Sequence, residues 1–322
     1  MKSVLVTGGA GFIGSVLCDT LLDQGFRVVC VDNLCDFYSP TIKRRNISAA
    51  LENPNYLFIE ADIRDSESIN SVFAKHQFDI VVHLAAMAGV RPSIENPEGY
   101  FTVNVMGTLN ILNACIKQGV KKLIFASSSS VYGDNPVPFK ETDNVDNPIS
   151  PYAATKKAGE LLCYTWHHLY AMSIVCLRFF TVYGPRQRPD LAIHKFTKLI
   201  MQGESVPFFG NGNTSRDYTY IDDIITGISS SIKLAYDSDN PIYEVINLGS
   251  STPVSLSEMI ETIEKTIGKR ARILHYPVQP GDVQRTFAEI SKAEMILGYK
   301  QNMPFSKGIA LFYEWFKSVA GS

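Results

Sequence analysis

The 322-residue chain has no excess of charge of either sign and no long hydrophobic run. It carries 30 Lys and Arg against 32 Asp and Glu, a net charge of −2, so bulk charge favours neither nucleic acid nor a membrane as a partner. No apolar stretch is long enough to span a bilayer, and the run after Met1-Lys2 is too short for a signal peptide. We expect a cytoplasmic protein that holds anionic ligands with local basic residues.

The chain also lacks the cysteine spacing of a disulfide framework or a zinc site. None of its six cysteines forms a CxxC pair, and most lie inside apolar runs. In a chain of this length they are typical of reduced core thiols. The sequence therefore predicts no metal site. The cysteines stand at positions 18, 30, 35, 115, 163 and 176.

Short β-rich runs alternate with helical stretches in the first half of the chain. This alternation predicts a parallel sheet with right-handed crossovers, an α/β fold with a Rossmann-like doubly wound sheet. The predicted strands are Ser3–Val6, Arg27–Val31, Leu57–Glu60, Ile80–His83, Leu123–Ala126 and Ile174–Leu177. The predicted helices between them are Gly14–Gln24, Ser66–His76, Pro97–Gln118 and Pro151–Ala171.

The pattern changes after Arg178. Gly, Pro and Asn gather at Tyr183–Asp190 and Val206–Thr214, which predicts loops. Helical stretches then recur at Ile193–Gln202, Asp222–Leu234, Ser257–Ile267 and Phe305–Ser318. We expect residues 1–180 to form the Rossmann domain, with 217–248 returning to it. Residues 181–216 and 249–322 would form a smaller C-terminal α/β domain that binds the substrate.

A glycine-rich loop follows the first predicted strand. Glycines at these spacings allow a tight turn, close approach of the backbone to a pyrophosphate, and packing of helix on strand. The following helix would point its free N–H groups at the phosphates. The loop alone could be only a turn, but its position between strand and helix favours a dinucleotide site. Its cofactor-binding candidates are Gly8, Gly11, Phe12, Ile13 and Gly14.

Residues at the ends of the next three strands complete the predicted cofactor site. Asp32, followed by Asn33, ends the second strand, where a carboxylate accepts hydrogen bonds from the ribose of NAD and repels the extra phosphate of NADP. We therefore expect NAD, although Asp32 could also be a turn residue. Asp62 and Ile63 would meet the adenine. Leu84, Ala85 and Ala86 would lie beneath the cofactor.

A tyrosine and a lysine lie four residues apart, on one face of a predicted helix. Tyrosine titrates near pH ~10 and is a poor base at neutral pH. A nearby Lys156 and a positive nicotinamide favour phenolate and should lower the pKa of Tyr152. Tyr152 could then accept a hydroxyl proton, and Lys156 could also hold the nicotinamide ribose. Ser128, at the end of the fifth strand, could share that proton. The YxxxK spacing by itself also fits a surface helix.

Together these motifs resemble the extended short-chain dehydrogenase/reductases, in the nucleotide-sugar epimerase branch. The likeness covers essentially the whole chain and rests on GGAGFIG at 8–14, HLAA at 83–86, SSSSVYG at 127–133, YAATK at 152–156, LRFFTVYGPRQRPD at 177–190, RDYTYIDD at 216–223 and QPGDV at 279–283. It implies a catalytic triad of Ser128, Tyr152 and Lys156, and a homodimer paired through two long helices. Asn104, Ser127 and Phe179 would belong to the cofactor site. Phe209 would face uracil, and Arg216 would neutralise the diphosphate of a UDP-sugar.

The serine run separates epimerases from related families. The resembling 4,6-dehydratases carry Asp-Glu before VYG, and the UDP-glucuronate decarboxylases carry Glu, whereas this chain has Ser129 and Ser130. The acid that dehydration needs is missing. The resemblance therefore implies NAD-dependent epimerisation at C4 of a UDP-sugar through a transient 4-keto intermediate.

Three arginines indicate that the sugar carries a carboxylate. GVRPSIENP at 89–97 and FTVYGPRQRPD at 180–190 resemble the UDP-glucuronate 4-epimerases, and the galactose-type enzymes usually have Asn in place of Thr181. Arg91, Arg186 and Arg188 fall in stretches expected to border the cleft, and arginine grips a carboxylate with two hydrogen bonds. Arg188 with Thr181, Ser129 and Ser130 would hold the carboxylate against loss of carbon dioxide.

Several alternatives stay open. The arginines could bind diphosphate or solvate a loop. Gln279 stands where galactose-type relatives commonly have arginine; with Asp282 it is a substrate-binding candidate, and Arg285 could take over the phosphate contact. The expected reaction is conversion of UDP-glucuronate to UDP-galacturonate. UDP-glucose or UDP-N-acetylglucosamine 4-epimerisation and a non-catalytic NAD-binding regulator are the competing readings.

Overall fold

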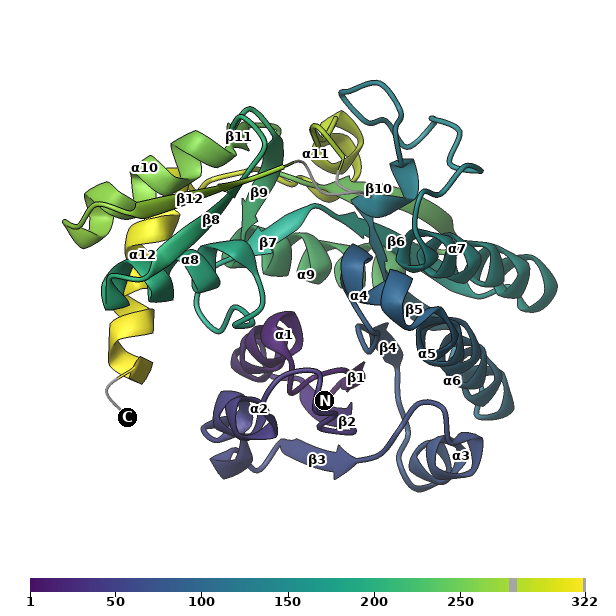
Figure 1. Cartoon of the computed structure of the whole chain (residues 1–322). Helices are drawn as coiled ribbons and strands as arrows, with labels where there is room; N and C mark the ends of the chain where they lie inside the picture. Colours follow the sequence, from purple (N-terminus) through teal and green to yellow (C-terminus); the bar gives the residue numbers. More distant parts are fainter. Residues whose placement is uncertain (278–282, 321–322) are drawn as a thin grey trace.

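A seven-stranded parallel sheet forms the centre of the molecule (Figure 1). The computed structural model describes residues 1–277 and 283–320. The strand order is β10-β6-β5-β4-β1-β2-β3, and every neighbouring pair is parallel. The order reverses between β1 and β4, and ligands of such sheets bind beyond the carboxyl ends of the strands at this point. The strands are β1 (Ser3–Thr7), β2 (Arg27–Asp32), β3 (Tyr56–Glu60), β4 (Ile80–His83), β5 (Lys122–Ser128), β6 (Ser173–Phe179) and β10 (Tyr243–Leu248).

Helices cover both faces of this sheet. On one face α1 packs against α9, which also contacts β5 and β6. On the other face α6 packs between α3 and α7, and α7 contacts β5 and β6. The sheet is therefore doubly wound, as predicted. The helical elements of this part are α1 (Phe12–Asp23), α2 (Pro40–Ile47), η1 (Ala50–Glu52), α3 (Ser66–Lys75), α4 (Val90–Glu95), α5 (Pro97–Phe101), the π-helical η2 (Thr102–Met106), α6 (Gly107–Lys117), η3 (Ser129–Tyr132), α7 (Pro151–Tyr170) and α9 (Ile221–Asp237).

Two smaller sheets lie beside the central one, at the upper left of Figure 1. The first has the order β11-β9-β7, and the second pairs β12 with β8 in parallel. Four helices accompany them, and α10 packs against both α8 and α12. These elements are β7 (Thr181–Tyr183), α8 (Ala192–Gln202), β8 (Ser205–Phe209), β9 (Ser215–Tyr220), β11 (Pro253–Ser255), α10 (Leu256–Ile267), β12 (Arg272–Tyr276), α11 (Ser291–Leu297) and α12 (Phe305–Ala320).

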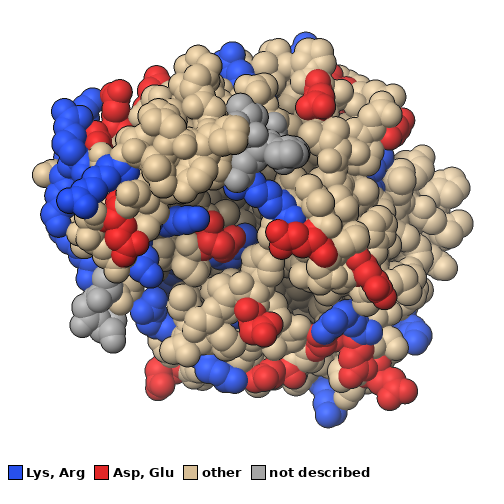
Figure 2. All heavy atoms as spheres, viewed as in Figure 1, with Lys and Arg blue, Asp and Glu red and all other residues tan. Residues whose placement is uncertain are grey.

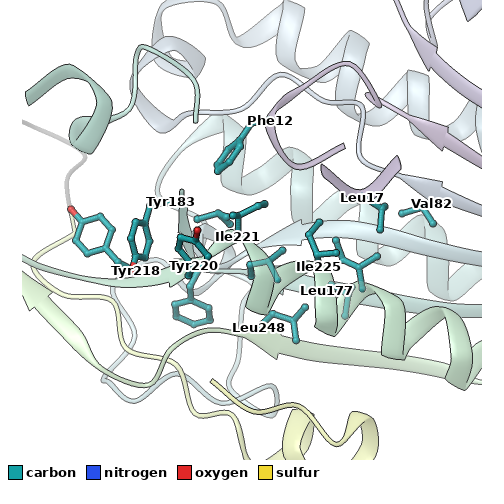
Figure 3. Packing of buried hydrophobic residues seen from close by; sticks show 14 of the residues in the cluster. Phe12, Leu17, Val82, Leu177, Tyr183, Tyr218, Tyr220, Ile221, Ile225 and Leu248 are labelled. Carbon is teal, nitrogen blue, oxygen red and sulfur yellow. The ribbon is translucent and has the colours of Figure 1, made fainter. Parts of the chain in front are cut away.

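One apolar cluster joins the smaller sheets to the central one. Phe12 and Leu17 of α1, Ile225 of α9 and Leu248 of β10 pack in the same cluster as Tyr220 of β9 (Figure 3). Burying each aliphatic side chain of this kind contributes about 1.5–3 kcal/mol relative to leaving it exposed. The shared core fixes the outer sheets in front of the carboxyl ends of the central strands.

The sequence predicted the first six strands to within two residues at each end. Two predictions were wrong. The loop expected at Val206–Thr214 begins with strand β8, because Val206 and its neighbours pair with β12. The single helix expected at Pro97–Gln118 is broken into α5, the π-helical η2 and α6. No described helix is both long and apolar enough to cross a bilayer.

Candidate active site

The glycine-rich loop forms a close turn between β1 and α1. Gly8 has φ +71°, and a Cβ there would lie 2.7 Å from the backbone nitrogen of Ala85. A Cβ on Gly14 would lie 2.2 Å from the Gly8 carbonyl oxygen. Gly11 is the N-cap of α1 and offers no side-chain cap to the first turn, which holds Phe12 and Ile13. The N–H groups of that turn are thus available to an anion such as a diphosphate.

Asp32 lies buried beside this loop and is paired with a lysine. Its carboxylate accepts hydrogen bonds from the backbone N–H of Leu34 at 2.8 Å and of Ala10 at 3.2 Å. The Lys43 ammonium lies 3.6 Å from Asp32 Oδ1, and both side chains are buried. Lys43 was not among the residues predicted for this site. The Ser39-Pro40 helix start, which places Lys43 one turn into α2, was the signal for it.

The residues after β3 and β4 are held by side-chain hydrogen bonds. Asn33 donates to Asp62 at 2.8 Å, and Arg64 binds the same carboxylate. The hydrogen bond from Arg64 is the main reason that the pKa of Asp62 falls to about 2. Ile63 is buried against Gly107. Leu84, Ala85 and Ala86 follow β4 and are partly exposed along the glycine loop.

His83 is a structural residue. Its ring contacts the Thr7 hydroxyl at 2.7 Å and the Thr108 hydroxyl at 3.0 Å. Burial lowers its pKa to about 3, so the ring is neutral at physiological pH. It ties the ends of β1 and β4 to α6.

Asn104 fastens the segment after β4 to the helix of the catalytic candidates. Its side chain bonds both the N–H and the carbonyl of Met87, at 2.8 and 2.9 Å, and donates to Thr155 at 3.0 Å. Asn104 lies in the π-helical η2, and π-bulges are frequent at functional sites. Asn104 therefore positions the walls of the site.

Tyr152 and Ser128 meet at the carboxyl end of β5. The phenol of Tyr152, on the first turn of α7, is hydrogen-bonded to the Ser128 side chain. Ser128 also accepts from the Ser130 N–H at 3.1 Å. Burial raises the pKa of Tyr152, while the Ser128 hydrogen bond and the charge of Arg188 act to lower it. In the chain alone the net shift is upward, because burial outweighs these two opposing effects.

Lys156 lies one turn further along α7. Its Nζ is 6.0 Å from the centroid of the Tyr152 ring and donates to the Ala126 carbonyl at 2.7 Å. Burial lowers the pKa of Lys156 to about 8. The buried ammonium is anchored between β5 and the phenol, where it can favour a negative charge.

Ser127 takes part in a buried charge network that the sequence analysis did not foresee. Its hydroxyl donates to Glu160 at 2.6 Å, and Arg178 binds both oxygens of Glu160 at 2.9 Å. Glu160 stands eight residues after Tyr152, which places it on the same face of α7. The network holds α7 on β5 and β6. Its spacing along the helix was the only signal available in the sequence.

Arg188 lies in the segment after β7 and comes near Tyr152. Its guanidinium binds both oxygens of Asp190, at 3.0 and 2.9 Å, and lies 5.3 Å from the centroid of the Phe37 ring. It is near enough to Tyr152 to act on the pKa of the phenol. Arg186, in contrast, pairs with Asp19 of α1 at 2.7 Å. Of the two arginines, Arg188 is the one placed at the reaction centre.

The other substrate candidates lie on several different elements. Arg91 lies over the ring of Phe209 at 5.4 Å, and Phe209 contacts Tyr276 of β12 at 5.4 Å between ring centroids. Arg216 lies on β9 next to the strand that holds Thr181. Ser129 and Ser130 begin η3 directly after Ser128, and Phe179 ends β6 beside it. Gln279 and Asp282 lie outside the described residues.

The space-filling view shows the surroundings of the site. This face is hollowed where the outer sheets meet the layer of α1 and α2, and basic and acidic side chains mix around it (Figure 2). In residues 1–277 and 283–320, no group of three or more His, Cys, Asp or Glu is arranged to hold a metal ion.

Comparison with known proteins identifies the family. The model of the GDP-mannose 4,6 dehydratase family matches residues 5–312. A UDP-glucuronate 4-epimerase of Thermodesulfobacterium geofontis is 43% identical over 98% of this chain and 97% of its own length. The chain belongs to the nucleotide-sugar epimerase branch of the extended short-chain dehydrogenase/reductases. The resemblance inferred from its motifs is confirmed.

Solved structures of this family have the same fold. The UDP-glucuronic acid 4-epimerase of Bacillus cereus, crystallised with UDP-glucuronic acid and NAD, superposes with a TM-score of 0.92 at 38% identity, over 99% of this chain and 100% of that one. A Thermotoga maritima UDP-glucose 4-epimerase with UDP-glucose gives 0.89 at 33% identity, over 99% and 100%. The family therefore includes enzymes for both acidic and neutral sugars.

Proposed function

We propose that the protein is an NAD-dependent isomerase that interconverts UDP-glucuronate and UDP-galacturonate at C4. The observation that carries the proposal is that Arg188 lies near enough for its charge to act on the phenol of Tyr152, which also interacts with Ser128. An acid-sugar epimerase needs a proton acceptor and a cation for the carboxylate in one place. Relatives named UDP-glucuronate 4-epimerase, and one solved with UDP-glucuronic acid and NAD, support the same activity.

The described residues fit NAD. Side chains are excluded from Gly8 and Gly14 by backbone contacts, α1 begins without a side-chain cap, and Asp32 places a carboxylate at the end of β2. When bound, NAD supplies an acceptor for the hydride of the sugar C4 and returns it to the opposite face. Phe12, Ile13 and the glycines would hold the diphosphate, and Asp32 the ribose. Asn33, Asp62, Ile63 and Leu84–Ala86 would border the adenine and ribose, while Asn104, Ser127 and Phe179 would support the site.

The chain's own residues move the proton. Tyr152 accepts the proton of the 4-hydroxyl, Ser128 shares that hydrogen bond, and Lys156 favours the phenolate. The resulting 4-keto sugar turns over in the pocket, and Tyr152 returns the proton after hydride comes back to the other face. Because burial raises the pKa of Tyr152, the positive charges around it are essential for the first step.

Arg188 would control the fate of the keto intermediate. Oxidation of glucuronate at C4 gives a β-keto acid, which loses carbon dioxide when its carboxylate aligns with the ketone. Arg188 can grip that carboxylate with two hydrogen bonds, as it grips Asp190 in the structure. Ser129 and Ser130 follow Ser128, and Thr181 lies two residues after Phe179, the strand partner of Ser128, so all three are further candidate hydroxyl donors. Holding the carboxylate out of alignment favours epimerisation over decarboxylation.

The remaining substrate contacts follow from the outer sheets. We propose that residues 1–180 and 217–248 form the NAD domain and that 181–216 and 249–322 form the substrate domain, since β10 joins the central sheet. Phe209 and Arg91 lie together and would take the uracil side of the nucleotide, and Arg216 the diphosphate. The six cysteines are free thiols, which supports a cytoplasmic location.

We also propose a homodimer. Large apolar side chains are about half exposed on adjacent helices: Phe101 (45%), Met106 (51%), Leu161 (55%) and Tyr164 (53%). The helical run from α5 to α6 and helix α7 pack together, so these residues form one apolar face. A second copy would cover it, with two helices from each subunit forming a four-helix interface. This surface is called the helical face below.

A comparison of three sugars tests the proposed activity. Purified protein is incubated separately with UDP-glucuronate, UDP-glucose and UDP-N-acetylglucosamine, and the products are separated by chromatography. We expect the 4-epimer of UDP-glucuronate only, because the neutral sugars leave Arg188 without a carboxylate. Turnover of a neutral sugar alone would show the competing UDP-hexose specificity. No 4-epimer from any of the three would contradict the proposal and favour a non-catalytic NAD-binding role.

A further inference from the structure

The hydroxyl of Tyr38 is buried but has no hydrogen-bond partner within the described residues. Buried hydroxyl groups nearly always have a partner, because an unpaired one destabilises the folded protein. The loop Asn33–Ser39, which carries Tyr38, lies between β2 and α2 and follows Asp32 directly. A partner supplied by a ligand would account for this hydroxyl.

Tyr38 lies over the glycine-rich loop. Its hydroxyl oxygen is 3.9 Å from the point at which a Cβ on Gly11 would lie, so it is close to the turn that begins α1. On the other side the Lys43 ammonium is 5.1 Å from the centroid of the Tyr38 ring. Burial is the main reason that the pKa of the Tyr38 phenol is raised, and the nearby charge of Asp32 raises it further. Tyr38 therefore remains a neutral donor of one hydrogen bond at physiological pH.

The neighbouring Phe37 connects this loop to the reaction centre. The Arg188 guanidinium lies 5.3 Å from the centroid of the Phe37 ring, within the range of a cation–π contact. The charge of Arg188 acts on the phenols of both Tyr38 and Tyr152. The loop and the catalytic tyrosine thus share one arginine.

We propose that Phe37 and Tyr38 form a clasp over the bound cofactor. The Tyr38 hydroxyl donates a hydrogen bond to a phosphate oxygen of the NAD diphosphate above Gly11, and the contact of Phe37 with Arg188 keeps the clasp closed. This inference rests on the proposed NAD-dependent function and extends it. It assigns retention of the cofactor to a loop that the glycine motif does not include.

A phosphate oxygen fits this position better than the ribose or the adenine. The diphosphate lies against the first turn of α1, which begins at Gly11. The ribose hydroxyls are expected at Asp32, whose carboxylate can accept them, and the adenine at Asp62 further along the sheet. A hydrogen bond from a neutral phenol to a charged oxygen is also stronger than one to a neutral acceptor.

Retention of NAD by purified protein tests the clasp without an activity assay. We expect Tyr38→Phe to release NAD about tenfold faster than the wild type, the effect of losing one hydrogen bond to a charged oxygen. Release is followed by rapid gel filtration and chromatography of the nucleotide that stays with the protein. Tyr313→Phe, the same change on α12, should retain NAD as the wild type does. Release of NAD by Tyr38→Phe at the wild-type rate would overturn the proposal.

Thermal unfolding separates this role from a structural one. Because the Tyr38 hydroxyl has no partner in the protein, Tyr38→Phe should not lower the melting temperature of protein without added NAD. In saturating NAD the variant should gain less in melting temperature than the wild type. The opposite result would be a Tyr38→Phe variant that melts at a lower temperature than the wild type without NAD and gains as much as the wild type when NAD is added. It would show that the hydroxyl is structural and would contradict the proposed clasp.

A double-mutant cycle tests the connection to Arg188. Phe37→Leu and Arg188→Ala each remove the same contact, so the double variant should release NAD no faster than Phe37→Leu alone. Phe37→Tyr keeps an aromatic face and should retain NAD. Additive effects of the two changes would overturn the role of Phe37. If no sugar is epimerised while Tyr38→Phe still loses NAD selectively, the clasp stands and the proposed reaction fails.

Discussion

At the scale of single residues, the chemistry depends on a phenol that the protein makes harder to ionise. Burial raises the pKa of Tyr152, and the Ser128 hydrogen bond and the charge of Arg188, both within the described residues, oppose it. The bound cofactor carries a positive nicotinamide, which adds to this opposition. Proton transfer and cofactor binding are therefore coupled at Tyr152.

Removal of the phenol hydroxyl should separate binding from chemistry. We expect Tyr152→Phe to keep bound NAD and UDP-sugar but to lose activity by at least about a hundredfold, the usual contribution of a positioned general base. The measurement is turnover of UDP-glucuronate together with the NAD content of the purified variant. Activity within a few fold of the wild type would remove Tyr152 from the mechanism.

Arg188 should distinguish the acid sugar from its nucleotide. We expect Arg188→Ala to reduce turnover of UDP-glucuronate about a hundredfold or more, because a bidentate charged contact is lost, while the Kd of UDP changes little. Calorimetry with UDP and a turnover assay make the comparison. If turnover of UDP-glucuronate and affinity for UDP fell by the same factor, Arg188 would bind the diphosphate and not the carboxylate.

Lys156 should affect stability at alkaline pH. Burial lowers its pKa to about 8 from an ordinary value of 10.5. Between these values the unfolded chain binds more protons than the folded one, so the contribution of Lys156 to stability rises with pH. We expect the unfolding free energy of the wild type to increase relative to that of Lys156→Met from pH 8 to 10.5. An unchanged difference between the two would contradict the lowered pKa.

At the scale of the elements, helix α7 has two functions. One face carries Tyr152, Lys156 and Glu160 toward β5, where each makes a buried contact. The opposite side exposes Leu161 and Tyr164. A single helix thereby connects the reaction centre to the proposed interface between subunits.

A charge on the helical face should prevent pairing. We expect Leu161→Asp to give a monomer in light scattering at concentrations where the wild type is a dimer, because the carboxylate would be buried in an apolar interface. Leu311→Asp on α12 is the matched control, since Leu311 is also exposed and lies outside the helical face. A wild-type protein that is itself monomeric, or a dimeric Leu161→Asp, would contradict the proposed interface.

Strand positions could be predicted from sequence because buried parallel strands are short and apolar. β4, Ile80–His83, was predicted with both ends correct. β8 was missed because Pro207 and the nearby glycines indicated a loop, and its pairing with β12 about seventy residues away leaves no local signal. The π-helical turn around Asn104 was missed because nothing in the residues of Thr102–Met106 distinguishes a π-helical turn from an α-helical one.

At the scale of the whole molecule, the candidate site is assembled from segments that are far apart in the sequence. The motifs predicted that Gly8–Gly14, Ser128 and Tyr152 share a crevice, because all follow the carboxyl ends of the central strands. They could not predict that Lys43 pairs with Asp32 or that Phe37 meets Arg188. Such contacts depend on loop conformation, and the apolar cluster that joins the two parts of the chain sets their distance.

The central claim is that hydride leaves C4 of the sugar and returns to the same carbon. The most direct test uses UDP-glucuronate with deuterium at C4, followed by mass spectrometry and NMR of the UDP-galacturonate formed in ordinary water. Transfer within one closed site predicts that all the label stays at C4 of the product. Loss of the deuterium to solvent, or its appearance at another carbon, would contradict the account.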